Sequence, residues 1–230
     1  MSEPPLKFGG LQKTSLIDFP NKIASVLFTA GCNLRCPFCH NWRLVLEPEG
    51  PFLAEDQVLQ VLESRKRHVK AVVITGGEPT TQKDLPKFLA ELKQREFAVK
   101  LDTNGFFPDV LEECLPYLDY VALDVKASLE KYNLLGAQST ESYVRTVEML
   151  KQGKVDYEFR TTVVPGFVDA EDIPKIGELA KDAKRLALQQ FIPDDTLDKT
   201  FHDVKPYSSE VIACFADVIK KYVNTVMLRV

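Results

Sequence analysis

Strand and helix patterns alternate along almost the whole of this 230-residue chain, and this alternation limits the possible folds. The strand patterns are short apolar runs rich in β-branched residues, and between them apolar residues recur at helical spacing. We expect strands at residues 23–29, 71–75, 97–102, 120–125, 157–164, 186–191 and 223–230. We expect helices at residues 55–67, 85–92, 111–118, 143–150, 173–184 and 211–219.

Strands that alternate with helices predict an α/β fold, with a parallel sheet and the helices outside it. Six βα-type units are fewer than the eight of a closed barrel, so an open partial (β/α)6 barrel and a doubly wound open sheet both fit. In either fold the functional site lies at the C-terminal ends of the strands. Polar and glycine-rich segments follow the expected strands at residues 32–40, 76–79, 102–104 and 124–126.

The composition is that of a globular protein, because apolar residues make up 45% and charged residues 27% of the chain. The formal net charge of −4 indicates no polybasic surface for nucleic acid or anionic lipid. The longest nearly apolar stretch, residues 23–31, is far short of the ~20 residues that cross a bilayer, and no targeting segment is visible. We expect a cytoplasmic protein with a single domain over residues 1–230, in which residues 1–22 form an N-terminal extension that packs on the barrel.

Three of the five cysteines, Cys32, Cys36 and Cys39, lie on one loop after the first expected strand. In a reducing compartment such a cluster more often binds metal or performs redox chemistry than forms disulfides. A structural zinc site would add His40, but the adjacent Cys39 and His40 would then have to bind the same ion. A redox pair would use Cys36 and Cys39 and leave Cys32 without a role. An iron–sulfur cluster held by three thiolates would leave one iron open to substrate.

The C-x3-C-x2-C spacing, with the aromatic Phe38 before the third cysteine, resembles the signature of the radical S-adenosylmethionine (SAM) superfamily. This resemblance implies a partial (β/α)6 barrel of the radical SAM type. It also implies SAM chelated to the open iron of a [4Fe–4S] cluster, whose ligands would be Cys32, Cys36 and Cys39.

A second segment, Gly76-Gly77-Glu78-Pro79, is similar to the GGEP element of the same superfamily. Because glycine has no side chain, Gly76 and Gly77 would let the backbone approach a ligand closely. Glu78 could accept a hydrogen bond from the methionine ammonium of SAM. The alternative interpretation of this segment is an ordinary turn between a strand and a helix.

A narrower resemblance is to the glycyl-radical-enzyme activating enzymes, and among them to the activating proteins of anaerobic ribonucleotide reductase. The sequence strings that support it are GLQKTSLIDFP (10–20), CHN (39–41), LDTNG (101–105), DVK (124–126), VVPG (163–166) and QQFIP (189–193). The resemblance implies a glycyl radical enzyme as the partner, and an electron donor such as flavodoxin or ferredoxin. The long activating enzymes carry an inserted ferredoxin-like unit with extra cysteines, which this chain lacks, so we expect one cluster.

The resemblance also implies a monovalent cation beside the cofactor, at positions that match Asp102, Thr103 and Asp124. Two carboxylates that converge on one site would repel each other unless a cation lay between them. Lys126 could supply part of that charge or contact the substrate. The remaining candidates for cofactor binding are Asn104, Arg160 for the carboxylate or ribose of SAM, and Gln190 for adenine or substrate. For each of these side chains the alternative is an ion pair or polar contact at the rim of the barrel.

The chemistry implied by the family is the one-electron reductive cleavage of SAM to methionine and a 5′-deoxyadenosyl radical. This radical would remove a Cα hydrogen from a glycine of the partner, while the protein supplies position and charge and no general base. The motifs fill the chain, so we expect the side of the barrel opposite the cysteine loop to stay open until a macromolecular substrate closes it. The alternatives are a radical SAM enzyme acting on a small molecule, such as the deazapurine-forming ring-contraction enzymes, and a zinc-binding module.

Four other residues have no place in these motifs. Cys114 and Cys214 lie on apolar helical stripes, where we expect buried, inert thiols. His68 and His202 have no motif around them, and we expect them at the surface or the rim.

Overall fold

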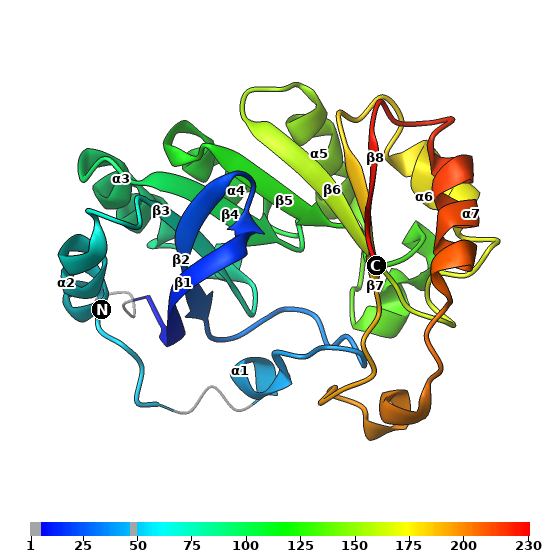
Figure 1. Ribbon diagram of the computed structural model, residues 1–230, viewed down its shortest axis with the longest axis horizontal. Helices are drawn as coiled ribbons and strands as arrows, with labels where there is room; N and C mark the ends of the chain where they lie inside the picture. The colour runs from blue at the N-terminus through cyan, green and yellow to red at the C-terminus, as the bar shows by residue number, and fades with distance from the viewer. Residues whose placement is uncertain (1–5, 47–49) are drawn as a thin grey trace. The chain divides into compact units, whose positions relative to one another are not determined.

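The computed structural model describes residues 6–46 and 50–230 (Figure 1). Within these residues the strands follow one another in the sheet in chain order, from β1 to β8. Strand β1 (Phe8–Phe19) pairs antiparallel with β2 (Lys22–Thr29). The pairs β2–β3, β3–β4, β6–β7 and β7–β8 are parallel. The predicted α/β class with a mostly parallel sheet is therefore confirmed.

Every predicted strand and helix is present in the structure. The other strands are β3 (Ala71–Gly76), β4 (Ala98–Thr103), β5 (Tyr120–Asp124), β6 (Asp156–Val163), β7 (Leu186–Gln190) and β8 (Val226–Arg229). The helices are α1 (Trp42–Leu46), α2 (Glu55–Arg65), α3 (Leu85–Gln94), α4 (Pro108–Cys114), α5 (Glu141–Lys151), α6 (Ile173–Leu179) and α7 (Ser209–Ile219). Short 3-10 helices are η1 (Pro79–Thr81), η2 (Leu115–Tyr117), η3 (Leu129–Leu135) and η4 (Lys199–Asp203).

Two differences from the predicted elements have local causes. Helix α6 ends at Leu179 instead of residue 184, because the chain turns there and Asp182 adopts a left-handed backbone with φ +64°. Strand β1 is not among the predicted strands, because it contains Gly9-Gly10 and most of its residues are exposed or only partly buried. Its pairing with β2 explains why this segment is nevertheless a strand.

The contacts divide the chain into two compact units. Unit 1 comprises the described residues of Met1–Cys32, Asn41–Thr103 and Phe107–Val121. Unit 2 comprises Asn33–His40, Asn104–Phe106 and Ala122–Val230. The cysteine loop, residues 32–40, is shared, since Cys32 belongs to unit 1 and the other two cysteines belong to unit 2.

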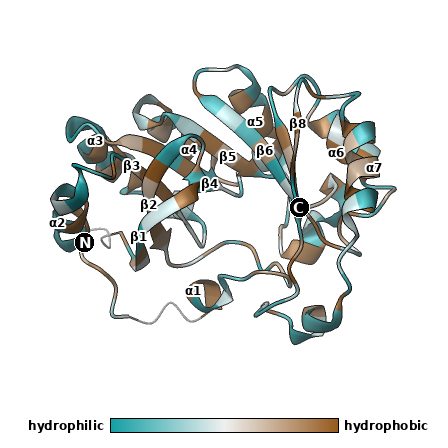
Figure 2. Ribbon diagram, in the orientation of Figure 1, coloured by the Kyte–Doolittle hydropathy of each residue, from teal (hydrophilic) through white to brown (hydrophobic). Residues whose placement is uncertain are grey.

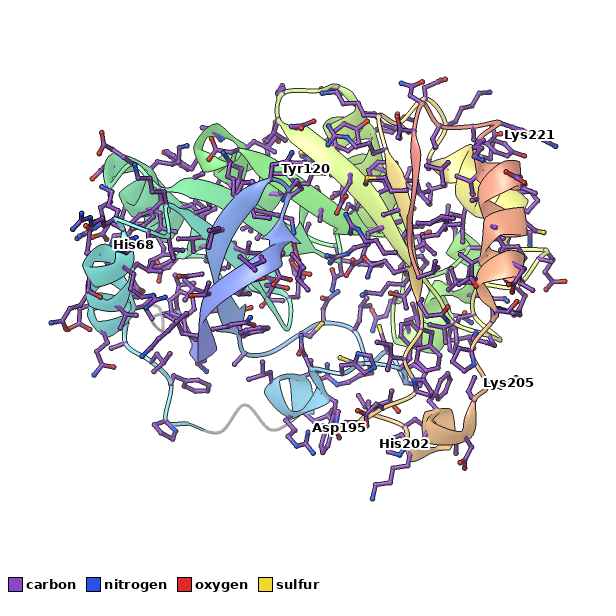
Figure 3. The ribbon with its side chains drawn as sticks, viewed as in Figure 1. His68, Tyr120, Asp195, His202, Lys205 and Lys221 are labelled. Carbon is purple, nitrogen blue, oxygen red and sulfur yellow. The ribbon has the colours of Figure 1, made fainter. Side chains whose placement is uncertain are left out.

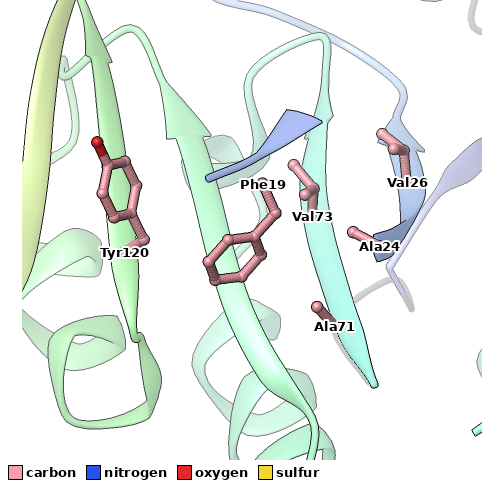
Figure 4. Packing of buried hydrophobic residues seen from close by; sticks show 6 residues of the cluster. All are labelled: Phe19, Ala24, Val26, Ala71, Val73 and Tyr120. Atoms are coloured by element: carbon pink, nitrogen blue, oxygen red, sulfur yellow. The ribbon is translucent and has the colours of Figure 1, made fainter. Parts of the chain in front are cut away.

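The core of unit 1 lies between its strands and helices. On one side of the strands Phe19 and Tyr120 pack with small apolar residues of β2 and β3, and the ring centroids are 6.3 Å apart (Figure 4). Helix α3 buries Leu85, Phe88 and Leu92, which recur at the spacing predicted for its apolar stripe. Each fully buried side chain of this size contributes about 1.5–3 kcal/mol.

The core of unit 2 is formed by β6, β7 and the helices α5, α6 and α7. Figure 2 shows hydrophobic residues along these elements. Helix α7 buries Ile212, Phe215, Ala216 and Ile219. The prediction that Cys214 is buried is wrong, because this residue lies on the exposed side of α7, away from that stripe.

The remaining surface expectations are met. His68 and His202 are exposed, as predicted (Figure 3). None of the helices in the described part of the chain combines the length and the apolar character that spanning a bilayer requires.

The two cysteines outside the loop are expected to differ sharply in reactivity. Cys114 is 0% exposed, and burial raises the pKa of its thiol to about 12. At pH 8 the Cys114 thiol is therefore protonated as well as shielded, whereas Cys214 is exposed. Iodoacetamide at pH 8 should modify Cys214 in the native protein and Cys114 only after unfolding, as measured by peptide mass spectrometry. Equal labelling of both thiols in native protein would contradict this burial.

Candidate active site

In unit 1, β3 ends in the predicted glycine turn, residues 76–79, which packs against the chain that follows β2. The Gly77 amide donates to the Thr29 carbonyl and the Glu78 amide to the Gly31 carbonyl, both at 2.8 Å. Gly76 has φ +110°, and a Cβ on Gly77 would lie 2.0 Å from the Gly31 oxygen. Glycine is thus required here for the packing of backbone on backbone, a reason that the sequence did not reveal.

The carboxylate of Glu78 joins the ends of β3 and β4. Glu78 is 1% exposed, and its Oε1 accepts hydrogen bonds from the Thr80 amide at 3.0 Å, the Thr80 hydroxyl, and the Thr103 hydroxyl at 2.7 Å. The structure therefore brings together two predicted site residues, Glu78 and Thr103. Thr80 was not predicted, although a threonine two residues after a helix-capping glutamate is a recognisable pattern.

A buried ion pair lies on β4. The Lys100 Nζ is 2.6 Å from the Asp102 Oδ1, and the two side chains are 3% and 8% exposed. The two residues share one face of the strand, because side chains alternate with a period of two. Asp102 was predicted as a site residue and Lys100 was not, yet a lysine inside an apolar strand pattern is the signal that could have identified it.

The residues after the cysteine loop return to the glycine turn. The Asn41 Nδ2 donates to the Gly76 carbonyl at 2.8 Å, and the Gly31 amide donates to the Leu44 carbonyl at 2.7 Å. Asn41 belongs to the CHN string, but no role was predicted for it. Its amide holds the end of β3 in place.

In unit 2, Cys36 and Cys39 lie in one tight turn, because the Cys39 amide donates to the Cys36 carbonyl at 3.1 Å. This turn is tied to a segment far along the chain, residues 192–204, which we call the strap. The Leu197 amide donates to the Cys39 carbonyl at 3.1 Å and the Asp198 amide to the Pro37 carbonyl at 2.8 Å. The strap thus holds the backbone of the turn at Pro37 and Cys39, and sequence reasoning gave no indication of it.

Phe38 anchors the cysteine loop in an aromatic cluster. Its ring is 9% exposed and packs edge-on against Phe167 at a centroid distance of 5.2 Å. Phe201 of the strap lies 6.3 Å from Phe38 and 6.0 Å from Phe167. Aromatic pairs at these distances contribute about 0.5–1.5 kcal/mol beyond the burial of their area.

Replacement of Phe201 with alanine should loosen the strap and the loop together. Because Phe201 is only partly buried, we expect a loss of about 1–3 kcal/mol in unfolding free energy. We also expect less iron bound after reconstitution, measured by colorimetric iron assay. Lys199→Ala, an exposed position on the same short helix, is the matched control and should change stability by no more than about 0.5 kcal/mol. Unchanged iron content in Phe201→Ala would show that the strap does not support the loop.

Three predicted residues of unit 2 form one charged cluster. The Asp124 carboxylate accepts from the Arg160 Nε at 2.7 Å and from the Lys126 Nζ at 3.0 Å. Burial would raise the pKa of Asp124, but the charges of Arg160 and Lys126 outweigh it and hold the pKa below its usual range. Burial lowers the pKa of Lys126, whereas the charges of Asp124 and then Cys36 raise it above its usual range. Both groups are therefore charged at neutral pH.

The other predicted residues of unit 2 are held by polar contacts. The Asn104 Nδ2 donates to the Asn33 Oδ1 of the cysteine loop at 2.8 Å. The Gln190 Nε2 donates to the carbonyls of Phe191 at 3.3 Å and Tyr207 at 3.2 Å. Asn104 is thus brought to the loop, and Gln190 is fixed at the end of β7.

The donor chemistry of the loop fits an iron–sulfur cluster better than zinc. Within residues 6–46 and 50–230, no three acidic, histidine or cysteine side chains are already arranged around a metal position. The choice between an iron–sulfur cluster and zinc therefore rests on the chemistry of the donor atoms. Three thiols on one loop suit a thiolate-held cluster with an open iron. His40 would be the fourth zinc ligand, but its Nε2 lies 2.9 Å from the Ile192 carbonyl, which can only accept. That nitrogen therefore donates to the strap, which leaves only the Nδ1 of His40 as a potential zinc ligand.

Comparison with known proteins gives a consistent result. The family model of the radical SAM superfamily matches residues 26–180. A putative glycyl-radical enzyme activating enzyme of Methanocaldococcus jannaschii, MJ1227, is 35% identical over 229 residues, which cover 96% of this chain and 94% of that protein. The pyruvate formate-lyase-activating enzyme of Clostridium pasteurianum is 28% identical over 203 residues, or 81% of each chain. The crystal structure of QueE from Escherichia coli aligns with a TM-score of 0.57 at 18% identity, and covers 98% of this chain and 92% of that one.

Proposed function

This chain belongs to the radical SAM superfamily and is an enzyme of the glycyl-radical-activating type, and we propose that it activates an anaerobic ribonucleotide reductase. The observation that carries the activating role is the similarity to MJ1227 over 96% of the chain. The strings at residues 10–20, 101–105 and 124–126 favour the reductase as partner. Pyruvate formate-lyase is the second candidate, because the relative from C. pasteurianum is named as its activating enzyme.

Membership of this superfamily implies a [4Fe–4S] cluster and SAM as cofactors. In our proposal Cys32, Cys36 and Cys39 hold the cluster, consistent with the donor set of the loop. When bound, the cluster and SAM supply a 5′-deoxyadenosyl radical for hydrogen abstraction. The protein contributes position, charge and exclusion of water, and needs no general base.

The positioning roles are divided between the two units. We assign the backbone of the glycine turn in unit 1 to close contact with SAM. Glu78, at the end of this turn, would accept a hydrogen bond from the methionine ammonium of SAM. In unit 2 we assign Arg160 and Lys126 to the negative or hydroxyl groups of the cofactor, because both are charged and held by Asp124. Phe38 anchors the cysteine loop, and Asn104 holds Asn33 of the same loop by a hydrogen bond. Gln190 is assigned to adenine or substrate at the end of β7.

The remaining parts of the proposal concern location and partners. We propose a cytoplasmic enzyme that receives electrons from a small donor such as flavodoxin or ferredoxin. A loop of the glycyl radical enzyme would enter the open side of the site and present its glycine.

An anaerobic assay tests the proposal directly. The protein is reconstituted with iron and sulfide, reduced, and mixed with SAM and an anaerobic ribonucleotide reductase. We expect 5′-deoxyadenosine together with the doublet of a glycyl radical in electron paramagnetic resonance. A reductase whose target glycine is replaced by alanine is the control and should give no doublet.

The other outcomes separate the alternatives. A doublet on pyruvate formate-lyase alone would move the activity to the second candidate partner. Cofactor cleavage with no doublet on either protein would favour a small-molecule substrate. If protein with a well-formed cluster gives neither 5′-deoxyadenosine nor a doublet, the radical SAM chemistry is overturned and the zinc interpretation returns.

A further inference from the structure

The buried ion pair of β4 bears on how charge is balanced at the SAM site. The Lys100 Nζ lies 2.6 Å from the Asp102 Oδ1, and both side chains are almost fully buried. A buried charge is retained only when an opposite charge and hydrogen bonds compensate for lost hydration. The ammonium and the carboxylate therefore depend on each other.

The position of the pair links it to the predicted cation ligands. Lys100 is the register partner of the buried Val73 on β3 and is itself 2% exposed, so its side chain is enclosed by the protein. Asp102 lies two residues further, next to Thr103 at the C-terminal end of β4. The Thr103 hydroxyl donates to Glu78 and is oriented by that contact.

A monovalent cation fits poorly on a carboxylate that already has an ammonium partner. A second positive charge on Asp102 would lie within a few ångströms of the Lys100 Nζ, and the two cations would repel each other in a buried environment. The other predicted carboxylate ligand, Asp124 of unit 2, has its own cationic partners in Arg160 and Lys126. Each carboxylate is thus compensated by side chains of this chain.

We propose that the Lys100 ammonium takes the place of a monovalent cation at Asp102, so that this enzyme binds SAM without K⁺ or Na⁺. Lys100 is a positioning residue in this account, because it acts through Asp102. The inference rests on the proposed function only in taking SAM as the ligand. It predicts that the protein carries its own cation instead of taking one from the buffer.

The test measures SAM binding by calorimetry to the reconstituted protein, in KCl, in NaCl and in choline chloride at equal ionic strength. For the unmodified protein we expect dissociation constants within twofold of one another. Lys100→Met removes the ammonium group and keeps the side chain as far as the position of the lysine Cε. Its SAM affinity should fall at least tenfold in choline chloride and recover in KCl, because a small cation can then occupy the vacated position.

A binding measurement without SAM gives a second readout. Sodium-23 relaxation should show no K⁺-competable Na⁺ binding to the unmodified protein, and such binding should appear in Lys100→Met. Lys93→Met is the matched control, because the same change breaks an exposed ion pair with Asp119, with side chains 34% and 39% exposed. It should behave as the unmodified protein in every salt.

The outcomes distinguish the inference from the proposed function. SAM binding by the unmodified protein that requires K⁺ or Na⁺ would overturn the role of Lys100 and leave the function intact. Absence of SAM binding in every salt would instead count against the function. If Lys100→Met does not fold, the double variant Lys100→Met/Asp102→Asn removes both charges, and it should bind SAM equally in the three salts. A K⁺ requirement in the double variant would place the cation at other residues and contradict the inference.

Discussion

Replacement of Cys36 with alanine is expected to reduce the release of 5′-deoxyadenosine from SAM to the background of protein without a cluster. The thiolate is the metal-binding form of cysteine, and a site with three protein ligands has no spare donor. Cys36 and Cys39 lie in one hydrogen-bonded turn, so Cys39 cannot move freely to take the place of Cys36 as a ligand. We expect Cys32→Ala and Cys39→Ala to have the same effect.

Cys114→Ala is the matched control for these variants. Cys114 is buried, its thiol has a pKa raised to about 12, and it lies at the end of α4. Its replacement should leave cofactor cleavage and iron content unchanged, at a cost in stability of about 1 kcal/mol. Iron per chain and 5′-deoxyadenosine should be measured on the same samples. Full cleavage by any one of the three loop variants would show that the cluster is not held as proposed.

Local sequence patterns were sufficient for most of the fold. Apolar runs such as residues 71–75 became buried strands, and the stripe of Leu85, Phe88 and Leu92 became the buried side of α3. Patterns failed where a segment is stabilised by pairing with another strand, and where a residue lies beside an apolar stripe. Strand β1 is stabilised by pairing with β2 and not by its own propensity, and Cys214 lies beside the apolar stripe of α7 and not on it.

The site was predicted as a set of residues but not as a set of contacts. Thr103 and Asp124 are the last residues of β4 and β5, and Glu78 follows the end of β3 by two residues, as the strand patterns predicted. The partners of these residues could not be read from spacing. Lys100 pairs with Asp102 inside a strand, and the strap reaches the cysteine loop from more than 150 residues away in the sequence. Such contacts depend on the tertiary fold, and they cannot be read from the local patterns of a single sequence.

Gly77 is under a strong steric constraint, and Gly77→Ala is expected to destabilise the protein severely. An added Cβ would lie 2.0 Å from the Gly31 oxygen and 2.8 Å from the Gly31 carbonyl carbon. Both atoms belong to backbone, so no side-chain rotation can relieve the overlap. Separation of the strands would break the hydrogen bonds from Gly77 to Thr29 and from Glu78 to Gly31. We expect a loss of about 3 kcal/mol or more, or a fall of roughly 6–12 °C in the midpoint of thermal unfolding.

Two further glycine variants separate steric overlap from backbone strain. Gly166 has φ +87° with nothing within 4 Å of an added Cβ, so Gly166→Ala should cost only the left-handed conformation, about 1–2 kcal/mol. A Cβ on Gly10 would lie 3.8 Å from the Phe28 ring, so Gly10→Ala should have almost no effect. Thermal unfolding of the three variants, followed by circular dichroism, should therefore rank Gly77→Ala as the least stable and Gly10→Ala as the most. SAM binding should be lost with Gly77→Ala alone, because only this change displaces the turn that we assign to the cofactor. An unfolding midpoint for Gly77→Ala equal to that of Gly10→Ala would mean that the turn is not packed on residues 29–31 in solution.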